Sequence, residues 1–161
     1  MKHEKILELL ERDCTLSADQ IAVMLDMPKE EVDSAIAGYK EDKTILGYKT
    51  LINWEKTDKE SVDALIELKV TPQHGEGFDR IAQRIYNYPE VKSVYLMSGG
   101  FDITVIVEGA SMKEVALFVA NRLAPMDAVI STATHFVLKK YKQDGVIFEQ
   151  ESTDERRMIT L

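Results

Sequence analysis

Hydrophobic residues near the start of the chain recur with the spacing of an α-helix. The apolar stripe that includes Ile6 predicts a first helix over residues 2–12. Ser17 and Gln20 have the spacing of a capping box, which predicts a second helix directly behind them. Pro28 suits the first position of a third helix, because its missing N–H costs nothing there. Helices joined by so short a connection are typical of a helix-turn-helix.

The hydrophobic pattern changes to period two in the second half of the chain, starting at Val62. The expected strands are 62–71, 91–97, 103–107 and 129–141, and the expected helices are 78–86 and 112–123. This β-α-β-β-α-β order predicts a ferredoxin-like domain, an antiparallel sheet with both helices on one face. The other face stays uncovered although its strands carry apolar residues, so we expect a second copy of the chain to cover it.

Between these two halves lie short β-prone segments, residues 45–48 and 51–52, which predict a pair of wing strands. The sequence therefore predicts an α+β protein in which a winged helix-turn-helix precedes a ferredoxin-like domain. The expected parts are a helix-turn-helix domain over 1–48, a linker strand over 49–61, a ferredoxin-like domain over 62–142 and a C-terminal tail over 143–161.

The charge balance restricts the partners that the protein can bind. The 161 residues contain 20 Lys and Arg against 28 Asp and Glu, a formal net charge of −8, so binding to nucleic acid requires a local basic surface. The apolar runs are too short for a membrane-spanning helix, and the N-terminus lacks the apolar stretch of a signal peptide. We therefore expect a cytoplasmic protein without a membrane partner.

Residue patterns for catalysis or metal binding are missing from the sequence. Cys14 is the single cysteine and the three histidines are far apart, so neither a metal site nor a cofactor is expected. There is no phosphate loop and no Ser/His/Asp order, and His135 with Asp102 is the only improvised catalytic pair. We expect a binding protein and not an enzyme.

Several motifs, taken in order, resemble the Lrp/AsnC family of transcription regulators. LSADQIAVMLDMPKEEV resembles the family's helix-turn-helix, and TILGYKTLIN resembles its wing. Gly99-Gly100-Phe101-Asp102 with the β-branched run behind it is similar to the signature of the family's second domain, and THFVLKKYK to the end of its last strand. The resemblance covers roughly residues 3–142. It implies that the first domain binds double-stranded DNA. It also implies that the second, the RAM domain, forms a homodimer or a higher oligomer (tetramer or octamer) and binds a small effector, typically an amino acid.

The predicted third helix has an unusual charge for an element that contacts DNA. The family usually places an Arg where this chain has Ala35, and six acids against two lysines give the segment from Asp26 to Asp42 a net charge of −4. Lysines supply phosphate contacts, and acids can accept a hydrogen bond from cytosine N4. The expected DNA-binding residues are Lys29, Glu30, Asp33, Ser34, Lys40, Lys43 and Lys49. The same acidity leaves an alternative open, an amino-acid-sensing or assembly module whose helix-turn-helix no longer binds DNA.

The glycine-containing turn of the second domain is the expected effector site. A carboxylate at Asp102 can accept the α-ammonium group of an amino acid, while neighbouring backbone N–H groups hold its carboxylate. Alternatively, Asp102 is a turn former that bonds to its own backbone, and the threonines of the last strand reflect β-propensity alone. The expected effector-binding residues are Ser98, Gly99, Gly100, Phe101, Asp102, Thr132 and Thr134.

Overall fold

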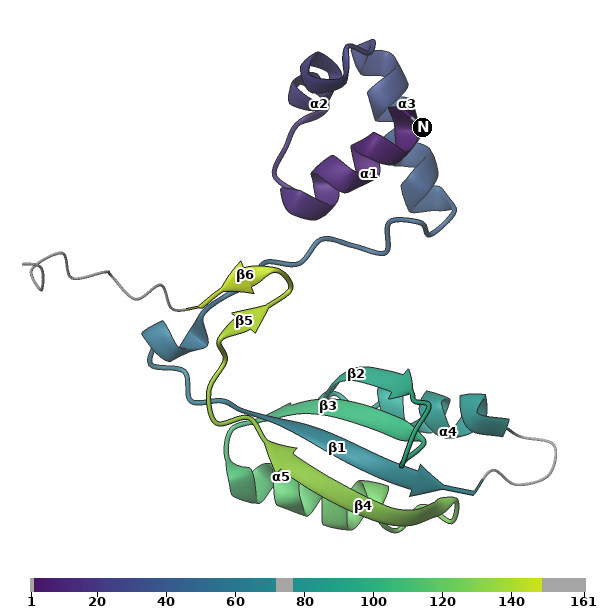
Figure 1. Ribbon diagram of the computed structural model, residues 1–161, viewed down its shortest axis with the longest axis vertical. Helices are drawn as coiled ribbons and strands as arrows, with labels where there is room; N and C mark the ends of the chain where they lie inside the picture. Colours follow the sequence, from purple (N-terminus) through teal and green to yellow (C-terminus); the bar gives the residue numbers. More distant parts are fainter. Residues whose placement is uncertain (1, 72–76, 149–161) are drawn as a thin grey trace, which may run out of the picture. The chain divides into compact units, whose positions relative to one another are not determined.

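A computed structural model describes residues 2–71 and 77–148 of the chain (Figure 1). Contacts within the chain divide it after Ile52 into two units, which are described separately below. The division falls inside the segment that the sequence predicts to be a linker.

The first unit consists of three helices: α1 over Lys2–Arg12, α2 over Ala18–Leu25 and α3 over Lys29–Glu41. The predicted capping box is present, because the Gln20 N–H donates to the Ser17 hydroxyl at 3.3 Å and the Ser17 N–H donates to the Gln20 side chain at 2.8 Å. Pro28 lies one position earlier than predicted, since it is the N-cap residue of α3 and not its first helical residue.

Apolar residues from all three helices, together with the residue before Pro28, form a small core between them. The buried members of this core are Ile6, Leu10, Ile21, Ala22, Met27 and Val32. All of them except Met27, which lies between α2 and α3, fall on the stripes that the helical period predicts, because a short helix gains most of its stability from burying one face.

The predicted wing strands are wrong, and so is the linker strand. Residues 46–53, all of which the structure describes, contain no strand, and the only regular element between the end of α3 and residue 62 is a 3₁₀ turn, η1, over Trp54–Lys56. Leu46 is 89% exposed, so its side chain is not packed against a neighbour. A strand needs a hydrogen-bonded partner, and β-propensity alone supplies none within this chain.

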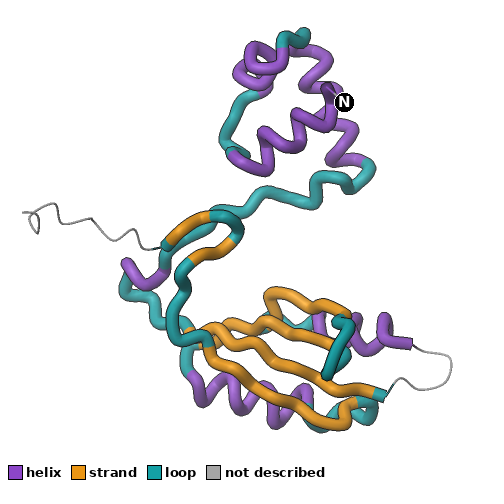
Figure 2. The backbone as a smooth tube through the Cα atoms, viewed as in Figure 1, coloured by secondary structure: helices purple, strands orange, loops and turns teal. Residues whose placement is uncertain are grey.

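The second unit has the predicted β-α-β-β-α-β order. Its strands are β1 (Val62–Val70), β2 (Val91–Leu96), β3 (Ile103–Gly109) and β4 (Val129–Phe136), and its helices are α4 (Gly77–Tyr86) and α5 (Met112–Phe118), the latter followed by a π-helical turn, η2 (Val119–Leu123). The four strands form an antiparallel sheet in the order β2-β3-β1-β4, and both helices cover one face of it (Figure 2).

Alternate residues of β1 form the centre of the core beneath the sheet. Ala64, Ile66 and Leu68 are fully buried and pack with Ile85 of α4 and Val115 of α5. This alternation confirms the period-two pattern of the sequence, because one face of the strand is buried and the other is not.

The end of the domain differs from the prediction. The last strand stops at Phe136 instead of residue 141, and a hairpin of two short strands, β5 (Lys142–Gln143) and β6 (Val146–Ile147), spans the predicted boundary between the domain and the tail. Asp144 and Gly145 form its turn, and both have positive φ angles. Asp-Gly is a strong hairpin signal, so this hairpin is visible in the sequence although it is not among the elements expected above.

Close packing of α5 against the sheet depends on a glycine at the end of β3. A Cβ atom at Gly109 would lie 2.9 Å from Cγ2 of Val115, which is 2% exposed. We expect Gly109→Ala to lower the free energy of unfolding by about 1–2 kcal/mol in a urea titration, because the core is overpacked. Gly100→Ala is the matched control, since a Cβ there meets nothing within 4 Å. Equal midpoints for the two variants would contradict this packing.

Candidate DNA-binding and effector sites

The helix α3 presents one face to the core of the first unit and the opposite face to solvent. Val32 is buried, and Ile36 and Tyr39 are half-buried. Glu30 and Ser34 are exposed on the other side of the helix. The structure therefore places these two candidate DNA contacts on an accessible helix face.

Two of the other candidates for DNA contacts, Lys29 and Asp33, form an ion pair with each other. The Nζ of Lys29 lies 2.7 Å from Oδ2 of Asp33, one helical turn further along, and this hydrogen bond is the main reason that the pKa of Lys29 is raised. Lys29 therefore stays charged, but it has to give up this carboxylate partner in order to contact a phosphate. Glu31 is paired as well, because its Oε1 lies 2.9 Å from Nε2 of His3 on α1.

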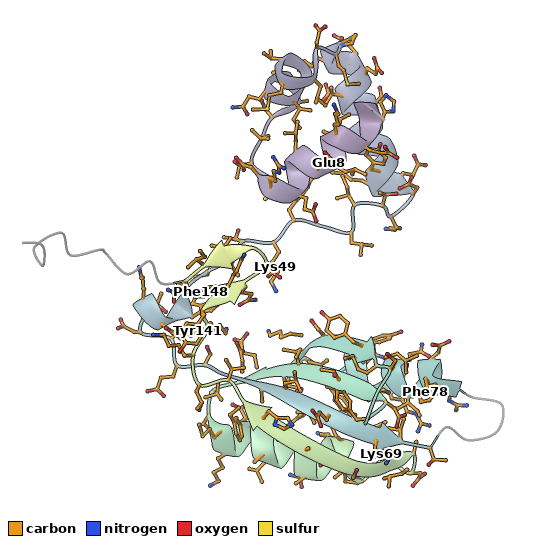
Figure 3. The ribbon with its side chains drawn as sticks, viewed as in Figure 1. Glu8, Lys49, Lys69, Phe78, Tyr141 and Phe148 are labelled. Atoms are coloured by element: carbon orange, nitrogen blue, oxygen red, sulfur yellow. The ribbon has the colours of Figure 1, made fainter. Side chains whose placement is uncertain are left out.

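The remaining candidate lysines follow one another at and beyond the end of α3. Lys40, Lys43 and Lys49 are all exposed, and Figure 3 labels Lys49 in the segment without regular structure. The Nζ of Lys40 lies 5.3 Å from the ring centre of Tyr48, a weak cation–π contact. These three lysines are the remaining basic candidates for contacts with DNA in the first unit.

The sheet face opposite the helices is mixed in character. Leu65 lies opposite Ile106 on its centre, while Glu67 lies opposite Thr104. The Oε1 of Glu67 is 3.4 Å from Nε2 of His135. Thr104 is only 5% exposed, and its hydroxyl has no hydrogen-bond partner within the described residues. The face thus has an apolar centre with polar groups around it, whereas the sequence pattern predicts a mainly apolar one.

Asp102 is bonded to the fold of its own subunit. Its Oδ2 accepts a hydrogen bond from the Val70 N–H at 2.8 Å, and its N–H donates to the Leu68 carbonyl at 3.0 Å. Its carbonyl accepts from the Met97 N–H at 2.8 Å. These contacts attach the β2–β3 turn to the end of β1, so the side chain of Asp102 bonds to a neighbouring strand and not to the backbone of its own turn, and one carboxylate oxygen is engaged by the protein itself.

The other expected effector residues lie around this turn or on β4. Ser98, Gly99 and Gly100 are exposed, Phe101 is half-buried, and Gly99 has a φ of 153°. On β4, Thr132 and Thr134 lie opposite Leu68 and Ile66, and are therefore on the helix side of the sheet. Thr132 shares the Leu68 end of β1 with Asp102, while Thr134 lies deeper along the strand.

A cavity of about 630 Å³ in the second unit was not expected from the sequence. It lies between the segment that leads into β1, the start of α5 and the residues after β4, and it is lined by Trp54 and Phe148 among others. Figure 3 labels Phe148. Its basic groups are paired. The Nζ of Lys59 lies 2.8 Å from Oε1 of Glu108 and 4.3 Å from the ring centre of Trp54. The Nζ of Lys140 likewise forms an ion pair with Oδ2 of Asp63.

The Lys59 hydrogen bond is also the largest influence on Glu108. It holds the pKa of that carboxyl below its ordinary value, with a smaller contribution from Lys92. These ion pairs therefore strengthen the junction between β3 and the linker segment, and they engage Lys59 and Lys140, two of the lysines that line the cavity.

Neither metal binding nor membrane insertion finds support in the described part of the chain. Residues 2–71 and 77–148 contain no group of three or more potential metal ligands. No helix among them is long and apolar enough to cross a bilayer.

Known proteins share both the sequence and the fold. The family model of the Lrp/AsnC ligand binding domain matches residues 63–147. The uncharacterised HTH-type transcriptional regulator YugG of Bacillus subtilis is 45% identical over 160 residues, which cover 99% of this chain and 96% of YugG.

Two solved structures show that the fold extends over most of the chain. A transcriptional regulator from Neisseria meningitidis in complex with L-Met matches with a TM-score of 0.72 at 19% identity, over 88% of this chain and 91% of that one. Escherichia coli AsnC matches with a TM-score of 0.69 at 17% identity, over 88% of this chain and 93% of its own. These relatives are transcription regulators and not enzymes. On this agreement of sequence, family model and fold, the chain belongs to the Lrp/AsnC family of transcription regulators.

Proposed function

We propose that this protein is a sequence-specific DNA-binding regulator that responds to an amino acid or a similar small effector. The main support is the 45% identity to an HTH-type regulator along nearly the whole chain, which includes the three-helix unit. In this proposal the first unit binds double-stranded DNA, and the second unit pairs two copies through the uncovered sheet face and binds the effector at Ser98–Asp102.

Electrostatics predicts how DNA binding depends on salt. Phosphate contacts come from Lys40, Lys43 and Lys49, since Lys29 is already paired with Asp33. A dimer would then make about six such contacts, which corresponds to a log–log slope of affinity against salt of about −5. The acidic residues in the rest of the chain repel DNA and oppose non-specific binding. DNA binding should therefore be measured at low salt, where the contacts of the lysines with phosphate are strongest.

Fluorescence anisotropy with upstream genomic DNA fragments at low salt tests the proposal. We expect binding at micromolar protein or tighter, and a clearly smaller salt slope for the double variant Lys43→Ala/Lys49→Ala. Lys113→Ala on α5 of the second unit is the matched control and should leave the slope unchanged. Absence of binding at micromolar protein, with and without each of the twenty amino acids, would rule out the DNA-binding function.

A second candidate function is favoured by the acidity of α3. Its segment from Asp26 to Asp42 carries a net charge of −4, six acids against two lysines, so the chain can alternatively be an amino-acid sensor or assembly module that has lost DNA binding. A thermal-shift screen against the twenty amino acids supports an effector function if one of them raises the melting temperature. A hit there together with no DNA binding would favour this second function.

A further inference from the structure

One row of side chains on α3 points away from the core of the first unit. Residues three, four or seven positions apart share a helix face, and the buried face is fixed by Val32 and Ile36. The opposite face therefore carries Glu30, Ser34 and Ala37, all of which are exposed. We call these three residues the outward row. In a helix-turn-helix, the residues near the start of this helix are the ones that contact base edges.

Glu30 is the acid of the first turn that is available for such a contact. Its neighbour Glu31 is held by His3 at 2.9 Å, and Asp33 is held by Lys29 at 2.7 Å. Glu30 itself has no hydrogen bond or close ion pair with any residue in the part of the chain that the structure describes, and its charge is only the smallest of the influences that raise the pKa of the neighbouring Lys29, which is bonded to Asp33. A ligand group can therefore reach it without breaking an existing contact.

A carboxylate can only accept hydrogen bonds, and this restricts the bases that it can contact in the major groove. Guanine offers N7 and O6 and thymine offers O4, which are all acceptors and repel it. Adenine has an amino donor, but the N7 acceptor beside it repels the second carboxylate oxygen. Cytosine presents its N4 amino group next to the C5–H and has no acceptor of its own in the major groove, so it is the base that suits Glu30 best.

We propose that Glu30 determines the DNA sequence that this protein recognises, by accepting a hydrogen bond from the N4 amino group of a cytosine in each half-site. The inference rests on the proposed DNA-binding function. In this arrangement the lysines beyond α3 supply affinity, and the carboxylate supplies specificity. Because its charge repels phosphate, Glu30 weakens binding wherever cytosine is absent, which raises the ratio of specific to non-specific binding.

Selection of random duplexes, followed by competition binding, tests this role of Glu30. Wild type is expected to select cytosine at one position of each half-site and to prefer it to adenine by about tenfold or more. Glu30→Gln is expected to select adenine at that position instead, because a glutamine amide pairs with both N6 and N7 of adenine. Glu31→Gln is the matched control, since it removes the same charge from a side chain that already has a partner. It should keep the cytosine and bind all duplexes slightly more tightly.

The outcomes separate this inference from the function on which it rests. If Glu30→Gln selects the same sequence as wild type, Glu30 does not contact the base and the inference is wrong, although the protein binds DNA. Equal changes of sequence preference in Glu30→Gln and Glu31→Gln would point to general electrostatics and would overturn it too. If wild type shows no selective binding at all, the proposed function itself fails.

Discussion

Replacing Ile106 by glutamate is expected to convert the proposed dimer into monomers. Ile106 lies on β3 at the centre of the uncovered sheet face, opposite Leu65 on β1. In a two-fold interface the substitution places a carboxylate on each side, buried and without a cationic partner. We expect the dissociation constant to rise by at least about 100-fold, a loss of about 3 kcal/mol. Sedimentation velocity over a range of concentrations measures it.

Leu117→Glu provides the matched control for this experiment. Leu117 is 50% exposed on α5, on the helix side of the sheet, so a charge there should leave the dimer intact. Leu65→Glu is a second variant on the uncovered face and should dissociate the dimer as Ile106→Glu does. Circular dichroism checks that all three variants fold. A folded Ile106→Glu variant that remains dimeric would mean that another surface joins the subunits.

The parts of the fold that were predicted correctly are those whose structure is determined by residues close together in the sequence. The capping box of Ser17 and Gln20 closes within four residues, so the start of α2 follows from the sequence alone. The alternation through Ala64, Ile66 and Leu68 likewise records which side of β1 is buried. Once the types and order of the helices and strands are known, the right-handedness of β-α-β crossovers and the packing of helices on the sheet allow only a few strand orders.

The errors occur where a segment depends on a partner or on a detail of packing. Residues 45–48 have β-propensity, but no strand in the described chain lies beside them to complete a ladder. The helix expected over 112–123 changes to π-helical hydrogen bonding from Val119 onward, which the apolar stripe does not reveal because its positions remain apolar. The hairpin turn at Asp144 and Gly145 is different, since its signal was present in the sequence.

The candidate sites were predicted by residue type, while the structure adds the contacts that determine what each residue can do. The pair of Lys29 and Asp33 follows from i,i+4 spacing and was foreseeable. The contact of His3 with Glu31 joins residues 28 positions apart and requires the packing of α1 against α3. Such contacts distinguish Glu30 from the other acids of its helix, and sequence reasoning had no way to do so.

Removing the side chain of Asp102 is expected to destabilise the second unit, whatever its role toward an effector. Asp102→Ala leaves the N–H of Val70 without its acceptor, at a residue that is only 5% exposed. We expect the free energy of unfolding to fall by about 1–3 kcal/mol in a urea titration, because a buried donor loses a charge-assisted hydrogen bond. Asp102→Asn keeps an oxygen that can accept from Val70, so its stability should stay within about 1 kcal/mol of wild type.

The asparagine variant then separates the structural role of Asp102 from a binding role. If the carboxylate also accepts the ammonium group of an amino acid, Asp102→Asn should weaken that binding about tenfold or more in calorimetry, while the fold is retained, because the charge is lost and the shape is not. The probe is whichever amino acid raises the melting temperature of wild type. Unchanged affinity in Asp102→Asn, together with a destabilised Asp102→Ala, would assign this aspartate to the architecture of the β2–β3 turn alone. An Asp102→Ala variant as stable as wild type would contradict the hydrogen bond to Val70 on which both expectations depend.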